Sequence, residues 1–355
     1  MSTAAFATHS QSTDLTYKCL SGNQYEITLS FYRDCAGVNA PSSVTVNISS
    51  VSCGQNYSIT LNPIAGTGKE ITPVCQTSTT QCNGGPWPGV QQYIYKGNTT
   101  FPMQCSDWVM SFSLCCRNGA INTITNPLSD NIYVEAHLDN LNYPCNSSPV
   151  FSNLPVPFVC VGQKYCFGHG ATDIDGDSLS YELVTPSTSD TTKVNYLAPY
   201  TATQPLSSNP IVTFNGATGD ICMTPNTIQV TVLAVLVKEW KNGKLVGSVL
   251  RDMQLRILNC NNSVPSVSGI NGTNQFSISA CAGTPLTFTV NSADADAGQT
   301  LSLVSNNSIS GASFNASAGS RPVGTFSWTP TMADISGNPY CFTVKVQDDA
   351  CPYNA

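Results

Sequence analysis

An internal repeat is the feature that most constrains how this chain can fold. The stretch that begins at Val159 (VCVGQKYCFGHGATDIDGDSLSY) aligns with the stretch that begins at Ala280 (ACAGTPLTFTVNSADADAGQTLSL). Because residues of the same kinds recur in one order with few gaps, we expect two copies of one module. The matched pairs are Cys160/Cys281, Gly162/Gly283, Phe167/Phe288, Asp173/Asp294, Asp175/Asp296 and, further on, Pro225/Pro330.

The residue pattern within each copy predicts β-strands. Runs of β-branched and aromatic residues alternate with turns rich in Gly, Pro, Asp and Asn. The dipeptide Asn242-Gly243 predicts a hairpin that pairs residues 228–240 with residues 244–260. Short strands with a turn about every 8–12 residues are typical of an immunoglobulin-like sandwich.

Residues 1–145 contain no copy of the repeat, yet they also alternate as strands, for example at 25–32 and 108–114, and no segment has a sustained helical period. We therefore predict an all-β fold of tandem immunoglobulin-like β-sandwiches held by disulfide bonds. The expected domains are a cysteine-rich N-terminal sandwich (1–145), an immunoglobulin- or cadherin-like sandwich (146–260) and the second copy of that module (261–355).

The second copy leaves room for no final strand after Cys351. An unpaired sheet edge is then expected near Phe342 and Val344, a liability that proteins normally cover. Two explanations remain open: the chain is cut from a longer array, or a strand from another molecule completes the sheet. Residues 1–14 are the candidate donor strand, and they would give head-to-tail self-association.

Sixteen cysteines indicate an oxidising compartment outside the cytosol. The sequence has no CxxC pair, and its three histidines lie far apart, so the spacing of a zinc site is absent. Immunoglobulin-like strand order predicts three disulfides, and Cys75–Cys82 is the local pair expected in the first domain. The three are Cys160–Cys260, Cys166–Cys222 and Cys281–Cys341. Adjacent strand residues face opposite sides, so Cys115 and Cys116 should bond to different partners.

The charge and hydropathy of the chain exclude two kinds of partner. A net charge of −7 and a pI near 4.8, without a basic patch, argue against nucleic-acid binding. No apolar run approaches the roughly 20 residues that a membrane span needs. No nucleophile elbow, metalloprotease motif or phosphate-binding glycine loop is present, so we expect a protein that is not an enzyme.

Alternating aspartates in one loop are the sharpest candidate site. Asp173, Asp175 and Asp177 place hard oxygen ligands on one side of a turn, which is what calcium requires. The alternative is a solvated turn in which these side chains cap backbone amides. The second copy retains Asp294 and Asp296, the weaker candidates for metal binding, and replaces the third carboxylate by Gly298 or Gln299.

Two other residue groups have a functional and a structural interpretation. His169 lies near the aspartates but alternates with Phe167 on a strand, which favours a surface or packing role. Trp87, Tyr93 and Tyr95 could form an aromatic platform for a sugar, or could cover the edge of a core.

Several motifs together resemble the N-terminal region of large Bacteroidetes surface proteins, which are associated with gliding motility or carry PKD-like or cadherin-like repeats and are exported by type IX secretion. The motifs are His9, Leu15-Thr-Tyr17-Lys-Cys19, Tyr25-Glu-Ile-Thr-Leu29, Tyr32-Arg-Asp-Cys35, Cys115-Cys-Arg-Asn118, ATDIDGDSLSY and Val249-Leu-Arg251-Asp252.

This resemblance implies an extracellular adhesin or stalk segment at the cell surface that presents or spaces a binding surface for a glycan or protein ligand. The Asp173/Asp175 loop also resembles the calcium-binding AxDxD motif of cadherins, although residues 146–149 lack the acidic ligands of a cadherin linker. The alternatives are a glycan-binding accessory region of a secreted enzyme and a filament subunit assembled by strand addition.

Overall fold

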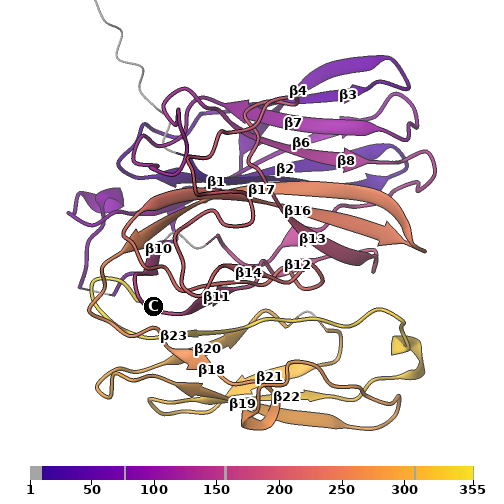
Figure 1. Ribbon diagram of the computed structural model, residues 1–355. Helices are drawn as coiled ribbons and strands as arrows, with labels where there is room; N and C mark the ends of the chain where they lie inside the picture. Colours follow the sequence, from indigo (N-terminus) through magenta and orange to yellow (C-terminus); the bar gives the residue numbers. More distant parts are fainter. Residues whose placement is uncertain (1–9, 76, 156–157, 308, 355) are drawn as a thin grey trace, which may run out of the picture. The chain divides into compact units, whose positions relative to one another are not determined.

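The computed structural model describes residues 10–75, 77–155, 158–307 and 309–354, and it confirms the all-β, disulfide-bonded fold. The chain forms two compact units, coloured along the sequence in Figure 1. The larger unit contains Met1–Thr72 and Thr79–Asn259, and the smaller unit contains Pro73–Ser78 and Cys260–Ala355. The chain therefore leaves the larger unit at residue 73 and returns to it at residue 79.

The larger unit is organised around a ring of strands, each hydrogen-bonded to the next. The last strand of the ring pairs with the first, which closes the circuit. In order, the ring contains β1 (Ser10–Ser21), β2 (Gln24–Asp34), β6 (Val90–Thr100), β4 (Gln55–Pro63), β3 (Val44–Ser50), β7 (Trp108–Leu114), β8 (Ile132–Leu138) and β17 (Lys244–Leu258).

The strand β17 joins the two halves of this unit. One of its edges pairs with β16 (Val230–Lys241) in the predicted hairpin, where Asn242 and Gly243 have positive φ angles of 52° and 73°. Its other edge is shared in succession by β8, β1 and β10 (Phe158–Cys160). The boundary expected at 145/146 therefore lies inside one sheet and one compact unit.

The remaining strands of the larger unit are short, apart from β13 (Ser178–Val184), which pairs with β16. Side chains from both halves of the unit form one continuous apolar core, which includes the fully buried Trp108 and Val235. The short strands are β5 (Lys69–Glu70), β9 (Val150–Phe151), β11 (Tyr165–Phe167), β12 (Ala171–Thr172), β14 (Thr213–Phe214) and β15 (Ile221–Met223).

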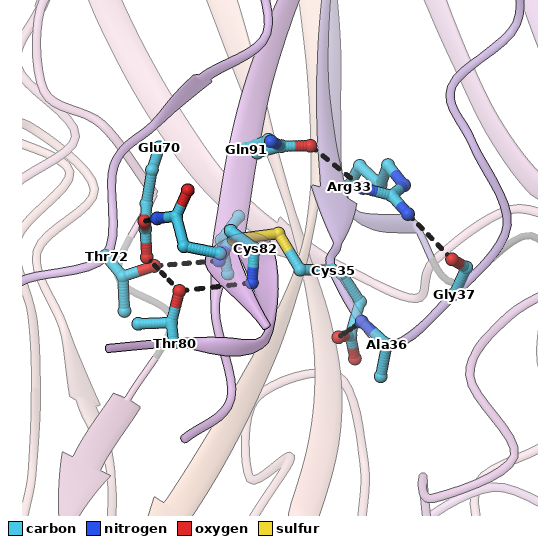
Figure 2. The surroundings of a disulfide bond; sticks show 12 residues. Arg33, Cys35, Ala36, Gly37, Glu70, Thr72, Thr80, Cys82 and Gln91 are labelled. Carbon is cyan, nitrogen blue, oxygen red and sulfur yellow. Dashed lines mark hydrogen bonds between the residues drawn. A yellow bond between two sulfur atoms is a disulfide. The ribbon is translucent and has the colours of Figure 1, made fainter. Parts of the chain in front are cut away.

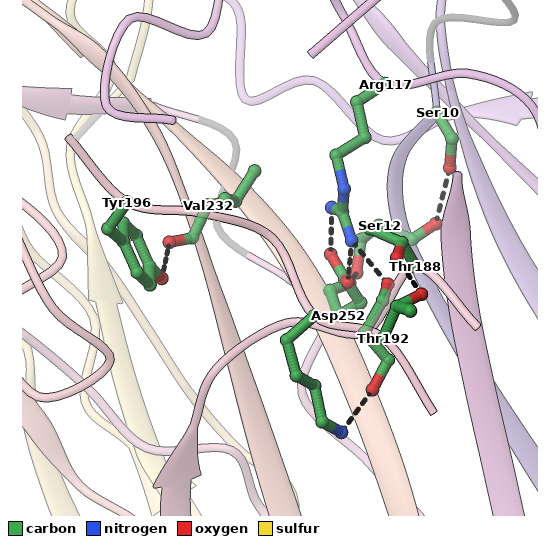
Figure 3. A network of polar contacts seen from close by, with 10 residues as sticks. Ser10, Ser12, Arg117, Thr188, Thr192, Tyr196, Val232 and Asp252 are labelled. Atoms are coloured by element: carbon green, nitrogen blue, oxygen red, sulfur yellow. Dashed lines mark hydrogen bonds and ion pairs between the residues drawn. The ribbon is translucent and has the colours of Figure 1, made fainter. Parts of the chain in front are cut away.

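Two buried ion pairs fix β17 against the N-terminal half. Arg251 donates to Asp14 on β1 at 3.1 Å. Figure 3 shows Arg117 bound through two nitrogens to the carboxylate of Asp252, at 2.6 and 2.8 Å. All four residues are at most 3% exposed. Removing one partner of such a pair leaves a buried charge uncompensated and typically costs about 3–5 kcal/mol.

The smaller unit is built from two sheets around its own apolar core. The four-stranded sheet contains β18 (Ser266–Val267), β19 (Leu286–Ala293), β22 (Val323–Trp328) and β21 (Ser313–Ala316), and β20 (Ser302–Ser305) pairs with β23 (Val344–Gln347). The ring of Phe342 stacks on that of Phe326, with centroids 4.8 Å apart. Phe342 thus contributes to the core, although it was expected on an exposed edge.

Fourteen of the sixteen cysteines are disulfide-bonded. Cys166 and Cys222 face each other on β11 and β15 and are joined, as the sequence predicts. Cys160 and Cys260 are both bonded, and Cys160 lies beside Leu258, two residues before Cys260. The other pairs within the larger unit include Cys19–Cys145 and Cys53–Cys105.

The predicted Cys75–Cys82 disulfide is wrong. Cys82 bonds to Cys35 (Figure 2), because a 3-10 turn at Gln81–Asn83, capped by Thr80, holds it beside the end of β2. Cys75 belongs to the smaller unit and bonds to Cys351, which therefore does not lack a partner. Tyr353 forms a bridge to Val74 there, so this part of the chain pairs with residues near the end of the smaller unit.

Two further cysteine predictions are also wrong. Cys281 and Cys341 are exposed and, among the described residues, are not joined by a disulfide. They lie in irregular segments ahead of β19 and β23, not within facing strands. Cys115 and Cys116 are bonded to each other, because β7 ends at Leu114 and strand alternation no longer separates them.

The expected donor strand is used within its own chain. Ser12, Thr13 and Asp14 pair with both β2 and β17. Residues 10–14 are therefore not free to complete a sheet in another molecule. The rest of the expected donor, residues 1–9 with His9, lies outside the described residues.

A fragment of residues 1–145 should not fold by itself, because it lacks β17, the partner of both β1 and β8, and part of the shared core. We expect no cooperative transition in circular dichroism melts of this fragment. Residues 1–259 are the matched control and should unfold cooperatively. Both fragments carry Cys75→Ser because Cys351 is absent, and the longer fragment also carries Cys160→Ser because it ends before Cys260. Cooperative unfolding of 1–145 would show that the two halves are independent domains.

The disulfides should also limit how far the chain can be stretched. A covalent route runs from Ser10 to Cys35, crosses to Cys82, returns to Cys75 and crosses to Cys351. This route has about 40 residues, or about 14 nm, against about 120 nm for the reduced chain at roughly 3.4 Å per residue.

Optical-tweezer extension from both ends should show this difference. The variant Cys351→Ser should lengthen the oxidised chain by tens of nanometres, on the order of the opened loop. The double variant Cys166→Ser/Cys222→Ser removes a pair off the route and should not change the length. An oxidised wild-type chain that extends by much more than the length of this route would contradict the disulfide assignment.

Candidate metal centre

The loop between β12 and β13 is shaped by Asp173. Its Oδ1 atom accepts hydrogen bonds from the backbone N–H groups of Asp175 (2.9 Å) and Asp177 (3.0 Å). This is the capping role that the sequence offered as an alternative to metal binding. The second oxygen, Oδ2, is buried and has no hydrogen-bond partner in the described part of the chain. One carboxylate thus builds the turn and still has an oxygen available for a ligand.

The third carboxylate of the site comes from Glu239 on β16. Asp173, Asp175 and Glu239 each offer an oxygen, and these atoms lie within 4.8 Å of one another. Asp175 is exposed, whereas Glu239 is completely buried. Asp177, the expected third ligand, lies outside this group of three and pairs with Lys241 at 3.2 Å.

The segment after Cys145 is hydrogen-bonded to two members of the site. Asn146 donates from Nδ2 to Glu239 at 2.8 Å, and the N–H of Ser147 donates to Asp175 at 2.6 Å. Asn146 is 3% exposed. Within the described residues, its Oδ1 and the Oε2 of Glu239 are buried without hydrogen-bond partners. A buried polar atom without a partner typically costs about 1–3 kcal/mol, so these oxygens favour a bound ligand.

The electrostatics of the site also favour a cation. Burial, followed by the nearby charge of Asp173, raises the pKa of Glu239 well above its usual range. Burial likewise raises the pKa of Asp173 to about 6. A divalent cation would compensate the clustered negative charge, and the unpartnered oxygens could coordinate it. Carboxylate and amide oxygens are hard ligands of the kind that Ca²⁺ prefers, so the residues fit calcium.

Glu239 was missed in the sequence, although its position contains a signal. Along β16 the residues Val235, Val237 and Glu239 alternate onto one face, and all three are buried. An acidic residue that continues a buried apolar face needs a compensating partner. The spacing does not reveal that this partner is a loop about 65 residues earlier in the chain.

The second copy preserves the framework of the site. The N–H of Ser263 donates to Asp296 at 2.7 Å, and the N–H of Asp296 donates to Asp294 at 2.9 Å. Asn262 donates to Asp348 at 2.6 Å, so Asp348 takes the place of Glu239. The repeated glycines match too: Gly162 and Gly283 have φ angles of 77° and 79° and donate to Pro225 and Pro330.

The second copy differs at the amide oxygen of Asn262, the residue that corresponds to Asn146. Gln299 donates from Nε2 to Oδ1 of Asn262 at 2.6 Å, so the amide oxygen is already engaged. No group of three carboxylates within 4.8 Å occurs in the described part of this copy. Metal binding at Asp294 and Asp296 stays a prediction, and the first copy fits an ion better.

His169 has a packing role, as the sequence predicts, although it lies between β11 and β12 and not on a strand. It is completely buried, with its ring edge-on to Phe167 (5.0 Å) and Phe151 (6.4 Å). Neither ring nitrogen has a hydrogen-bond partner among the described residues. Burial, together with the charge of Arg251, lowers the pKa of His169 to about 3. The imidazole is therefore neutral near pH 7.

Of the two interpretations of Trp87, Tyr93 and Tyr95, the structure does not support a platform formed by all three side chains. Trp87 is 40% exposed, but Tyr95 is completely buried and donates its hydroxyl to the carbonyl of Pro41 at 2.7 Å. Tyr95 therefore belongs to the core and cannot contact a sugar.

Comparisons with known proteins identify no family. No family model matches the chain, and no curated protein matches it. A solved structure of three immunoglobulin domains of titin (I67–I69, an E-to-A variant) is similar at 8% identity, over 97% of this chain and 96% of that one, with a TM-score of 0.17. None of the helices in the described residues has the length and apolar character needed to cross a membrane.

Acid should destabilise the fold through His169. Its folded pKa of about 3 lies below the ordinary 6.5, so the folded state binds fewer protons between these values. Stability should therefore fall as the pH drops below 6.5, by at most about 1.4 kcal/mol per pH unit. Urea unfolding at pH 7 and pH 5 should show a smaller loss for His169→Phe. The control His137→Gln removes a partly exposed histidine and checks that the effect is specific to the buried one. An equal loss in His169→Phe would contradict this assignment.

Proposed function

We propose that this chain is a non-catalytic segment of an extracellular cell-surface adhesin or stalk, and that calcium stabilises its larger unit. Fourteen disulfide-bonded cysteines and an all-β fold fit an extracellular protein. The resemblance to exported Bacteroidetes surface proteins supports the placement at the cell surface. Such a segment would space or present a binding surface for a glycan or protein ligand.

The group formed by Asp173, Asp175 and Glu239 is the observation that carries the calcium proposal. It joins the loop after β12 to the hairpin strand β16, and Asn146 ties it to the segment that follows the N-terminal half. An ion bound here would link three parts of the chain that are far apart in sequence. Calcium would therefore act as a cross-link that stiffens the unit, in addition to its disulfides.

Calcium should raise the unfolding temperature of the larger unit. At a concentration one hundred times the Kd, binding to the folded state adds about 2.7 kcal/mol. Differential scanning calorimetry in calcium and in EGTA measures this increment. Glu239→Gln and Asp175→Ala should abolish it, because each removes a ligand. Asp190→Asn, at an exposed aspartate outside the group, is the control and should retain it. No shift at millimolar calcium would refute the proposed site.

A further inference from the structure

A pocket opens next to the candidate metal centre. It has a volume of about 390 Å³ and shares two residues with the site, Asp175 and Asn146. The remaining wall is formed by Lys241 and the turn at 142–145, which includes Tyr143. Asp175 is the exposed member of the carboxylate group, so the pocket lies on the open side of the site.

The protein provides fewer ligands than calcium takes. Three side chains, Asp173, Asp175 and Glu239, each offer an oxygen within 4.8 Å of the others, whereas Ca²⁺ takes 6–8 oxygens. Glu239 on β16 is completely buried, whereas Asp175 is exposed and lines the pocket. The remaining coordination positions therefore face the pocket and would be filled by water or by oxygens of a ligand.

Charge selects the kind of ligand. When the three carboxylates bind the ion in their ionised form, they outweigh the two positive charges of calcium, and Lys241 is already paired with Asp177 at 3.2 Å. A second anion a few ångströms from this site would be repelled. Neutral oxygens in a pair, such as the vicinal hydroxyls of a sugar, can replace two waters without adding charge. Asn142, Tyr143 and Asn146 line the pocket, and amide and phenol groups can bind the other hydroxyls.

We infer that this pocket binds a neutral sugar in a calcium-dependent manner, with two vicinal hydroxyls completing the coordination of the ion. The inference rests on the proposed calcium site and assigns a ligand class to it. Tyr143 lines the pocket, and an aromatic ring is a group on which a sugar face can pack, so Tyr143 is the residue expected to contribute to sugar binding and not to calcium binding.

Europium luminescence tests the open coordination directly. Lifetimes in H₂O and D₂O with Eu³⁺ in the calcium site should report at least two bound waters. Methyl glycosides of neutral hexoses with vicinal hydroxyls should displace two of them. A site with fewer than two waters, or waters retained with every neutral glycoside, would overturn the inference. In both cases Eu³⁺ is bound, so the cation site itself would stand.

Titration calorimetry with calcium tests the assignment of residues. Sugar binding should be lost in EGTA and in Glu239→Gln. Tyr143→Ala should weaken sugar binding about tenfold while leaving calcium affinity within about twofold. Leu141→Ala, at an exposed residue outside the pocket wall, is the matched control and should leave both unchanged. Preference for methyl glucuronide over the neutral glycosides would overturn the charge argument. Absence of calcium binding would overturn the proposed site and this inference together.

Discussion

The larger unit depends on the position of β17. A strand has two edges, and β17 gives one to its hairpin partner β16 and divides the other among β8, β1 and β10. Without it the ring of strands would be open between β1 and β8, and the apolar core would lose Val249 and Met253. The first copy of the repeat is therefore both a module and the closing element of the N-terminal half.

Buried polar pairs make this arrangement specific. Hydrophobic burial would allow β17 to slide along its partners, but charges on β17 must meet their partners when they are buried. Arg251 meets Asp14, and Asp252 meets Arg117. Several of the motifs that underlie the resemblance to Bacteroidetes surface proteins meet here: Arg117 and Asn118 come from one motif and Asp252 from another. A third contributes Asp34, which accepts from Asn118 at 2.9 Å.

The sequence predicted what depends on local pattern. The repeat, the hairpin at Asn242-Gly243, the pair Cys166–Cys222 and the aspartate loop all follow from residues close together or from one module. The sequence did not predict features that depend on how distant segments meet. Cys75 is bonded to Cys351 because the segment Pro73–Ser78 belongs to the smaller unit. Glu239 joins Asp173 because strand register, which residue spacing does not encode, brings β16 to that loop.

The two copies differ in how the negative charge of the aspartate turn is compensated. Each has an aspartate turn tied to an asparagine and to a third acidic residue, Glu239 or Asp348. In the second copy Arg321 donates to the carbonyls of Asp296 and Gln299, so a fixed guanidinium brings positive charge to the turn. In the first copy Asn146 keeps an unpartnered oxygen among the described residues, and an exchangeable cation can take the equivalent role. A built-in cation leaves no coordination position for a ligand, whereas a bound ion does. Ligand binding is therefore expected in the copy whose turn lacks its own arginine contact.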